Sequence, residues 1–193
     1  MILRSNLSKT NLINCEFFCI VIGKLKNKRI TWGGLRMSDY ASQLKIELSH
    51  SKKVIKSYTT VFNELAIVCQ LKLEYSKEDS TLDGEKFIAD MDALISSGIN
   101  PLDFFYYSDN QEVDLSKIMI QLQTFITCYN TLDLTQRIII YHSYFKKANA
   151  DKIIQLLLER YQMYSVATIY RKINKSTIIL IEKMGKMLEK YEK

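Results

Sequence analysis

The amino-acid sequence predicts an all-α protein, in which a long N-terminal helix and a helical bundle precede a C-terminal helix-turn-helix. The chain of 193 residues contains one Pro and six Gly, which is too few for the many turns of a β protein. Apolar residues make up 47% of the chain and charged residues 25%, a balance typical of proteins that bury a core. Apolar side chains also recur at the spacing of an amphipathic helix in several segments.

The longest predicted helix spans residues 38–75. Ser38 and Asp39 offer side-chain oxygens for its N-cap. Its apolar stripe recurs at alternating steps of four and three residues, which is close to the heptad seam of a coiled coil. The stripe consists of Leu44, Leu48, Ser51, Ile55, Tyr58, Phe62, Leu65 and Cys69. Two interpretations stay open: the stripe pairs two copies of the chain, or a helix predicted over residues 114–130 covers it within one chain.

Shorter helices are predicted on either side of a Gly–Pro break. Residues 85–96 form one helix, whose inner face carries Phe87, Met91, Leu94 and Ile95. Gly98 and Pro101 end it, because Gly suits a helix C-cap and Pro cannot continue the hydrogen-bond ladder. Residues 114–130 form the next helix, whose inner face carries Ile118, Leu122, Phe125, Ile126 and Tyr129. Residues 76–84 are predicted to be a charged linker.

Residues 132–192 are predicted to contain a helix-turn-helix, the smallest motif that places an α-helix in a DNA groove. Ser165 suits the N-cap of its last helix. Ile169 and Ile173 fall on one buried face of that helix. The candidate DNA-binding residues, which can hydrogen-bond base edges and phosphates, are Ser165, Thr168, Tyr170, Arg171, Lys172 and Lys175. The alternative is an ordinary amphipathic surface helix, whose basic face serves only solubility.

The residues ahead of this helix also follow a known pattern. Residues 132–145 run from a short acidic turn through Arg137 and an aliphatic run to an aromatic end at Phe145. Together with the pattern Ser165-x-x-Thr168-Ile169-Tyr170-Arg171, this segment resembles region four of bacterial sigma factors. The chain is similar in this way to the ArpU-like and RinA-like late-transcription activators of phages and prophages. The spacer over residues 146–164 is a few residues longer than in that pattern and lacks its small-residue turn.

The resemblance implies a sequence-specific DNA-binding transcription regulator in the cytoplasm of a bacterial host cell, without a cofactor. Its expected partners are double-stranded promoter DNA and RNA polymerase, with a homodimer if the long helix pairs. The implied role is activation of phage or prophage late genes. The alternative, from a different class, is a helical protein-interaction module, such as an anti-activator or a phage or host-defence factor, that does not contact DNA.

Charge is distributed unevenly along the chain, whose net charge is +6. Residues 146–193 hold 11 Lys or Arg against 5 Asp or Glu, residues 37–145 hold 9 against 15, and residues 1–36 hold 7 against 1. The basic C-terminal segment can neutralise phosphates and release counterions, which supplies affinity for nucleic acid. The acidic middle favours another task, such as self-association or contact with a protein. Lys-rich ends that are simply solvated would give the same counts.

Three regions follow from these observations. Residues 1–36 are a basic extension, residues 37–130 a helical packing or association region, and residues 131–193 the helix-turn-helix region. The first region differs in composition from the rest, and Met37 followed by cap residues is typical of a start, so we expect the protein to fold without residues 1–36. The alternative is a basic arm that binds the DNA backbone.

Neither catalysis nor a metal site is predicted. His50 and His142 have no Ser, Cys or carboxylate partner at motif spacing. The cysteines lack metal-ligand spacing and are expected to be free thiols in a reducing compartment; they are Cys15, Cys19, Cys69 and Cys128. No apolar run approaches the ~20 residues that span a bilayer, so no membrane contact is expected.

Overall fold

The computed structural model describes residues 37–101, 115–160 and 162–191, with side chains from Ile46 onward, and is all-α as predicted. Its helices are, in chain order, α2 (Met37–Val68), α3 (Gly84–Ser96), α4 (Leu115–Asn130), α5 (Leu134–Ile140), the π-helix η2 (Tyr141–Phe145) that continues α5, α6 (Ala150–Leu158) and α7 (Val166–Leu188). Within the described residues no strand occurs, and the only strand-like pairing is a single bridge between Tyr75 and Leu82.

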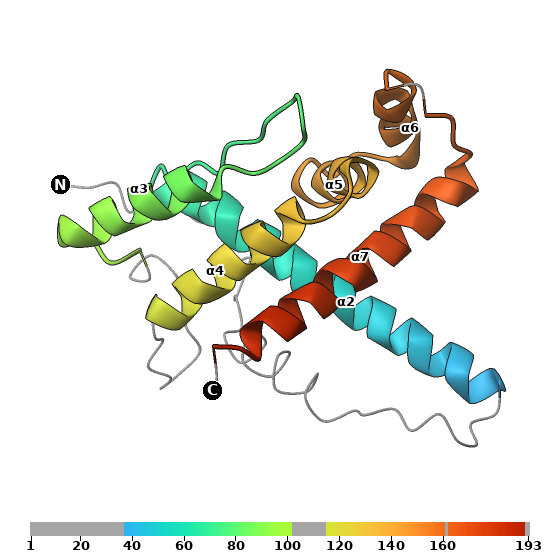
Figure 1. The fold of residues 1–193 in the computed structure, drawn as a ribbon, viewed down its shortest axis with the longest axis horizontal. Helices are drawn as coiled ribbons and strands as arrows, with labels where there is room; N and C mark the ends of the chain where they lie inside the picture. The colour runs from blue at the N-terminus through green and yellow to red at the C-terminus, as the bar shows by residue number, and fades with distance from the viewer. Residues whose placement is uncertain (1–36, 102–114, 161, 192–193) are drawn as a thin grey trace, which may run out of the picture.

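The main core lies where α2, α4 and α7 cross, with α3 packed along α4 (Figure 1). The apolar stripe of α2 faces into this core: Ile55 is fully buried, and Tyr58, Phe62 and Leu65 are at most 2% exposed. The Tyr58 ring stacks on the Phe125 ring of α4 with centroids 5.0 Å apart, and Phe62 also contacts Phe125. From Ile55 to Leu65 the stripe is therefore covered within the chain, as one interpretation predicted, and this part is not available as a seam between two copies.

The predicted helix over residues 38–75 is too long, because α2 ends at Val68. Gln70 adopts a left-handed backbone conformation with φ of 58°, and the Leu71 N–H donates to the Leu65 carbonyl over 3.2 Å, which closes the last turn. Leu71, in the segment without regular secondary structure that follows, is buried in the main core. The sequence conceals this end, since a left-handed residue after a helix is usually Gly.

Residues 75–82 form a short hairpin, where the sequence predicts only a charged linker. The Ser76 N–H donates to the Thr81 carbonyl over 2.9 Å. At the turn, the Asp79 carboxylate accepts hydrogen bonds from the N–H and hydroxyl of Thr81. Hydrogen bonds from the Ser76 and Thr81 side chains lower the pKa of Asp79 to about 2. Asp79, one of the acidic residues of this segment, thus belongs to an ordered turn.

The 75–82 hairpin is attached to the C-terminal helices by long-range hydrogen bonds. Arg137 of α5 and Arg160, which follows α6, donate to main-chain carbonyls at its tip. The Asn130 side chain at the end of α4 accepts from the Leu82 N–H over 2.9 Å and donates to the Leu82 carbonyl over 2.8 Å. The Arg137 and Arg160 contacts connect the two regions that the sequence predicts on either side of residue 131, whereas the Asn130 contacts attach the hairpin to α4.

A second, smaller core lies between α5, α6 and the N-terminal half of α7. Its buried residues are Ile138, Ile139, Ala150, Ile153, Leu157 and Ile169. The C-terminal half of α7 belongs to the main core through Leu180, Ile181 and Met184. α7 therefore runs from one core to the other. The predicted boundary at residue 131 falls in the turn between α4 and α5, yet packing continues across it.

None of the described helices is long and apolar enough to cross a lipid bilayer. Cys69 and Cys128 are free thiols, as predicted. The predictions for residues 1–36, including those for Cys15 and Cys19, lie outside the described residues, as do the side chains of Ser38, Asp39 and Leu44.

Candidate nucleic-acid interface

The candidate interface is built on α6 and α7, which are joined by residues 159–165 and pack against α5. Each helix begins with a polar N-cap: Asn149 accepts from the Lys152 N–H over 2.9 Å, and Ser165 accepts from the Thr168 N–H over 3.2 Å. Ser165 has the extended backbone (φ −80°, ψ 157°) typical of an N-cap. The cap predicted at Ser165 is confirmed.

The inner face of α7 is as predicted. Ile169 is fully buried in the smaller core. Ile173, one turn later, is half-buried and packs against both cores. These two side chains fix the rotation of α7 about its axis. Ala167, Tyr170 and Arg171 therefore point outward.

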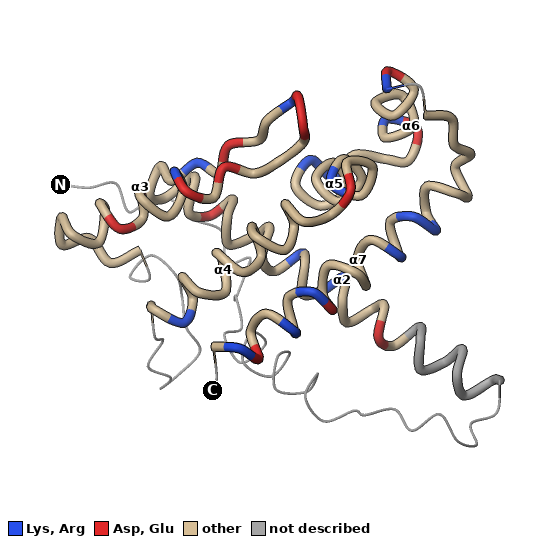
Figure 2. Tube along the Cα trace, in the orientation of Figure 1, with Lys and Arg blue, Asp and Glu red and all other residues tan. Residues whose placement is uncertain are grey.

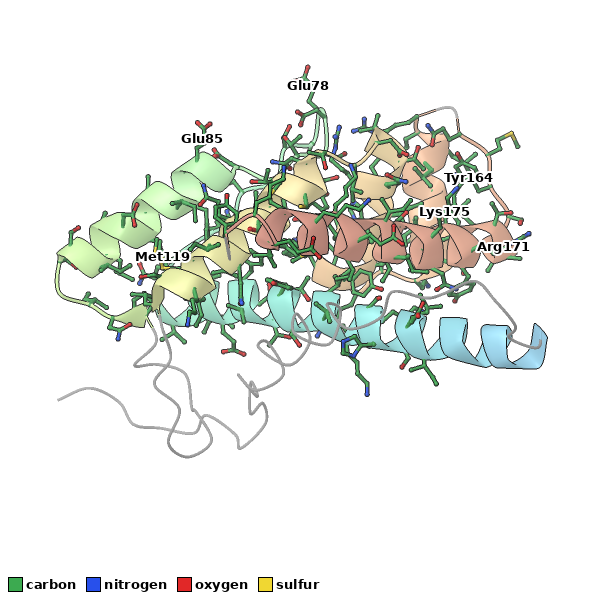
Figure 3. The ribbon with its side chains drawn as sticks, turned by 60° about the horizontal axis from the view of Figure 1, so that its bottom comes forward. Glu78, Glu85, Met119, Tyr164, Arg171 and Lys175 are labelled. Carbon is green, nitrogen blue, oxygen red and sulfur yellow. The ribbon has the colours of Figure 1, made fainter. Side chains whose placement is uncertain are left out.

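The outward face of this half of α7 is basic and partly apolar. Arg171 and Lys175 are exposed on successive turns, and Figure 3 shows them at the same end of α7. Tyr170, Val166 and Ala167 are also exposed. Between Arg160 and Glu182 the chain has no acidic residue, and Figure 2 shows Lys and Arg without Asp or Glu along this stretch of α7. This stretch of α7 is therefore positively charged, and its own residues include no carboxylate to oppose an anion.

Not all of the predicted site residues share this face. Lys172 is half-buried, and its ammonium lies 4.6 Å from the centroid of the Tyr164 ring, a cation–π contact within the protein. The hydroxyls of Ser165 and Thr168 lie 2.9 Å apart and hydrogen-bond each other. These three residues thus hold the start of α7, whereas Tyr170, Arg171 and Lys175 project from it.

The structure adds a second basic group that the sequence interpretation omitted. Lys146, Lys147 and Lys152 are exposed around the turn between η2 and α6. His142 lies beside them, and its pKa is lowered by partial burial and then by the charges of Lys146 and Lys152. The sequence could have indicated this group through the Lys146-Lys147 pair next to the Asn149 cap, because residues that flank a helix N-terminus lie together in space.

The chain also has an acidic hollow. An open cavity of about 1040 Å³ lies between the 75–82 hairpin, α3 and α4. Its lining includes four carboxylates and no Lys or Arg: Glu74, Asp83, Glu85 and Asp92. Glu74 pairs with Lys86 at 2.5 Å, and Asp83 caps α3. Within the described residues no group of His, Cys, Asp and Glu is arranged to hold a metal ion.

No protein-family model, curated protein or solved structure matches this chain. The interface is therefore defined by the chain's own geometry and charge. The resemblance to the phage activators stays a prediction.

Proposed function

We propose that the protein is a sequence-specific DNA-binding transcription regulator and that the N-terminal half of α7 enters the major groove. One observation carries this proposal: Arg171 and Lys175 project from a helix whose opposite side is fixed by the fully buried Ile169, and no carboxylate lies near them in sequence. A helix held in this way presents its donors in a fixed orientation, which readout of base edges requires.

The dimensions and charges suit a duplex. An α-helix with its side chains is about 10–12 Å wide, and the major groove is about 12 Å wide. Arg171, near the start of α7, has the forked donors that match guanine O6 and N7, while Lys175, one turn later, suits a phosphate. Lys146, Lys147 and Lys152 precede or begin α6 and offer further phosphate contacts.

The biological role that we propose is activation of phage or prophage late genes together with RNA polymerase in a bacterial cytoplasm. The sigma-like pattern of residues 132–145 and 165–171 supports it. The separation of charge supports it as well, since residues 37–145 carry a net charge of −6 and residues 146–193 carry +6. An acidic region attached to a basic one suits contact with a protein by the first and with DNA by the second.

Selection of duplexes from a random-sequence pool by the full chain, followed by mobility shifts on the winning sequence, tests the proposal. We expect Arg171→Ala to weaken binding by about 1–3 kcal/mol and to relax specificity at one base pair, and Lys175→Ala to reduce the salt slope by about one unit. Lys186→Ala is the matched control, because it removes the same charge from the exposed far end of α7. Enrichment of no sequence, or equal binding by all three variants, would refute the proposal.

A protein-interaction module remains the second candidate because of one observation. Met163, Val166 and Tyr170 are 84%, 43% and 57% exposed and lie within eight consecutive residues around the start of α7. Exposed apolar side chains that cluster in this way often mark a protein-binding surface. This candidate predicts that the random pool yields no enriched duplex.

A further inference from the structure

The first two turns of α7 expose apolar surface that the fold does not use. Val166 is 43% exposed and Ala167 is exposed, whereas Ile169, which follows them in the same helix, is completely buried. The smaller core is already filled by isoleucine and leucine side chains of α5, α6 and α7. Neither Val166 nor Ala167 is among the side chains that pack against this core.

The first turn of α7 also lacks the residue type that would stabilise it most. A carboxylate near a helix N-terminus interacts favourably with the helix dipole. α7 has no acidic residue in its first turn, like α4 and α5, whereas α3 has Glu85 and α6 has Asp151 there. Val at the start of an exposed helix is moreover a poorer helix former than Ala or Glu. This end of α7 therefore combines apolar surface with an absence of negative charge.

The arrangement of side chains along the helix gives this surface a direction. Ala167, Arg171 and Lys175 follow one another at steps of four residues and form one row on the outward face. Val166 and Tyr170 form the adjacent row. Each row changes from a small apolar group at the helix start to a polar or charged group one turn later. A helix that enters the major groove with its N-terminal end places its first side chains against base edges.

One chemical group in the major groove complements such a surface. Among the four bases only thymine presents a methyl group there, and small apolar side chains contact it. We propose, on the basis of the proposed DNA-binding function, that Val166 and Ala167 recognise thymine methyl groups in the target site. The neighbouring Arg171 fixes the register of these contacts along the groove. The protein's target is then a site in which thymines lie at defined positions.

Deoxyuridine tests this directly, because it pairs as thymine does and lacks only the methyl group. In the best duplex from the random pool, each thymine is replaced singly by deoxyuridine, and the affinity of the full chain is measured. We expect one or two positions to lose about fourfold in affinity each, because deoxyuridine lacks the methyl group whose burial stabilises the complex, and the other thymines to be neutral. A scan in which every thymine is neutral overturns the proposal.

A substitution in the protein assigns the contact to Val166. On the thymine duplex, Val166→Ala should weaken binding several-fold, and on the duplex with deoxyuridine at the sensitive position it should bind as the wild type does. Ile67→Ala on α2 is the matched control, since Ile67 is 71% exposed, apolar and remote from α7 in the chain. Equal losses on both duplexes would place the methyl contact elsewhere and overturn the assignment.

The outcomes separate this proposal from the proposed function. Enriched duplexes that bind equally with thymine or deoxyuridine would leave DNA binding intact and remove the methyl readout. A pool that yields no enriched duplex would remove both, and the exposed Val166 and Tyr170 would then belong to a protein-binding surface. Thermal unfolding of Val166→Ala, expected to match the wild type because Val166 is exposed, excludes a folding defect as the cause of weak binding.

Discussion

The guanidinium of Arg137 on α5 holds the main-chain carbonyl of Asp79, 58 residues earlier in the chain, with Nε at 3.1 Å and Nη2 at 2.8 Å. Its Nη1 donates to the carbonyls of Leu132 at 2.6 Å and Asn130 at 3.0 Å. One side chain thus satisfies three carbonyls: one at the end of α4, one in the turn between α4 and α5, and one in the 75–82 hairpin. Arg137 belongs to the sigma-like sequence pattern, and in this fold it joins the two regions of the chain.

The first prediction is that Arg137→Ala lowers the free energy of unfolding by about 2–3 kcal/mol, because hydrogen bonds from a charged donor are lost and the carbonyls remain. Arg137→Lys should recover less than half of this, since one ammonium cannot reach all three carbonyls. Urea unfolding followed by circular dichroism measures both, with the exposed Arg171→Ala as control. Equal stabilities of Arg137→Ala and wild type would mean that the hairpin is not held by this side chain.

Much of the fold could be predicted because helical periodicity and capping act within one segment. α3 spans Gly84–Ser96 where the sequence predicts 85–96, α4 spans Leu115–Asn130 where it predicts 114–130, and Gly98 ends α3 with φ of 84°. The 75–82 hairpin could not be predicted, because its order depends on Arg137 and Arg160, which are remote in sequence. No local rule brings those donors to its carbonyls.

In the candidate site, too, local rules predict some residues correctly and others not. Ser165 as a cap and Ile169 as a buried residue follow from local rules and agree with the structure. Lys172 was predicted to face outward with Arg171, but it turns toward the ring of Tyr164. Tyr164 lies in the connection before α7, whose path depends on how α6 ends and packs. Helical spacing alone therefore cannot predict the orientation of a side chain that contacts this connection.

The second prediction concerns the apolar stripe of α2. Ile55→Glu should abolish the fold, because Ile55 is fully buried and an unpaired carboxylate there is strongly unfavourable. Ile46→Glu, on the same helix where the side chain is 69% exposed, should leave the helical signal and the melting temperature unchanged within error. Circular dichroism and light scattering compare the two. A folded Ile55→Glu protein would restore the interpretation of the stripe as a seam between two copies.

The third prediction is that residues 131–193 do not fold stably by themselves. The C-terminal half of α7 buries Leu180, Ile181 and Met184 against the main core, and all three would be exposed in the fragment. Small domains have little stability in reserve, so this loss is severe. Hydrogen exchange and thermal melting of the fragment against the full chain check it. A cooperative melt of the fragment near the full-chain temperature would show that the smaller core is sufficient.

The fourth prediction is a loss of stability in mild acid that originates at His142. The ring lies edge-on to Tyr75 and Tyr141 with centroids 6.0 Å and 5.3 Å away, and burial followed by Lys146 and Lys152 lowers its pKa below the ordinary value of 6.5. The unfolded chain therefore binds a proton at a higher pH than the folded chain does. The contribution of neutral His142 is complete above pH 6.5 and is lost as the pH falls through the lowered folded value.

His142→Gln, which cannot titrate, should flatten the dependence of unfolding free energy on pH in the range directly below 6.5, the ordinary pKa of histidine. Asp79→Asn serves as the control, because Asp79 titrates in a lower pH range. The Asp79 pKa is lowered from 3.8 to about 2, so its contribution is present above 3.8 and disappears only as the pH falls toward 2. Urea unfolding at a series of pH values distinguishes the two variants. If His142→Gln kept the wild-type slope directly below pH 6.5, the acid sensitivity would have to come from another group.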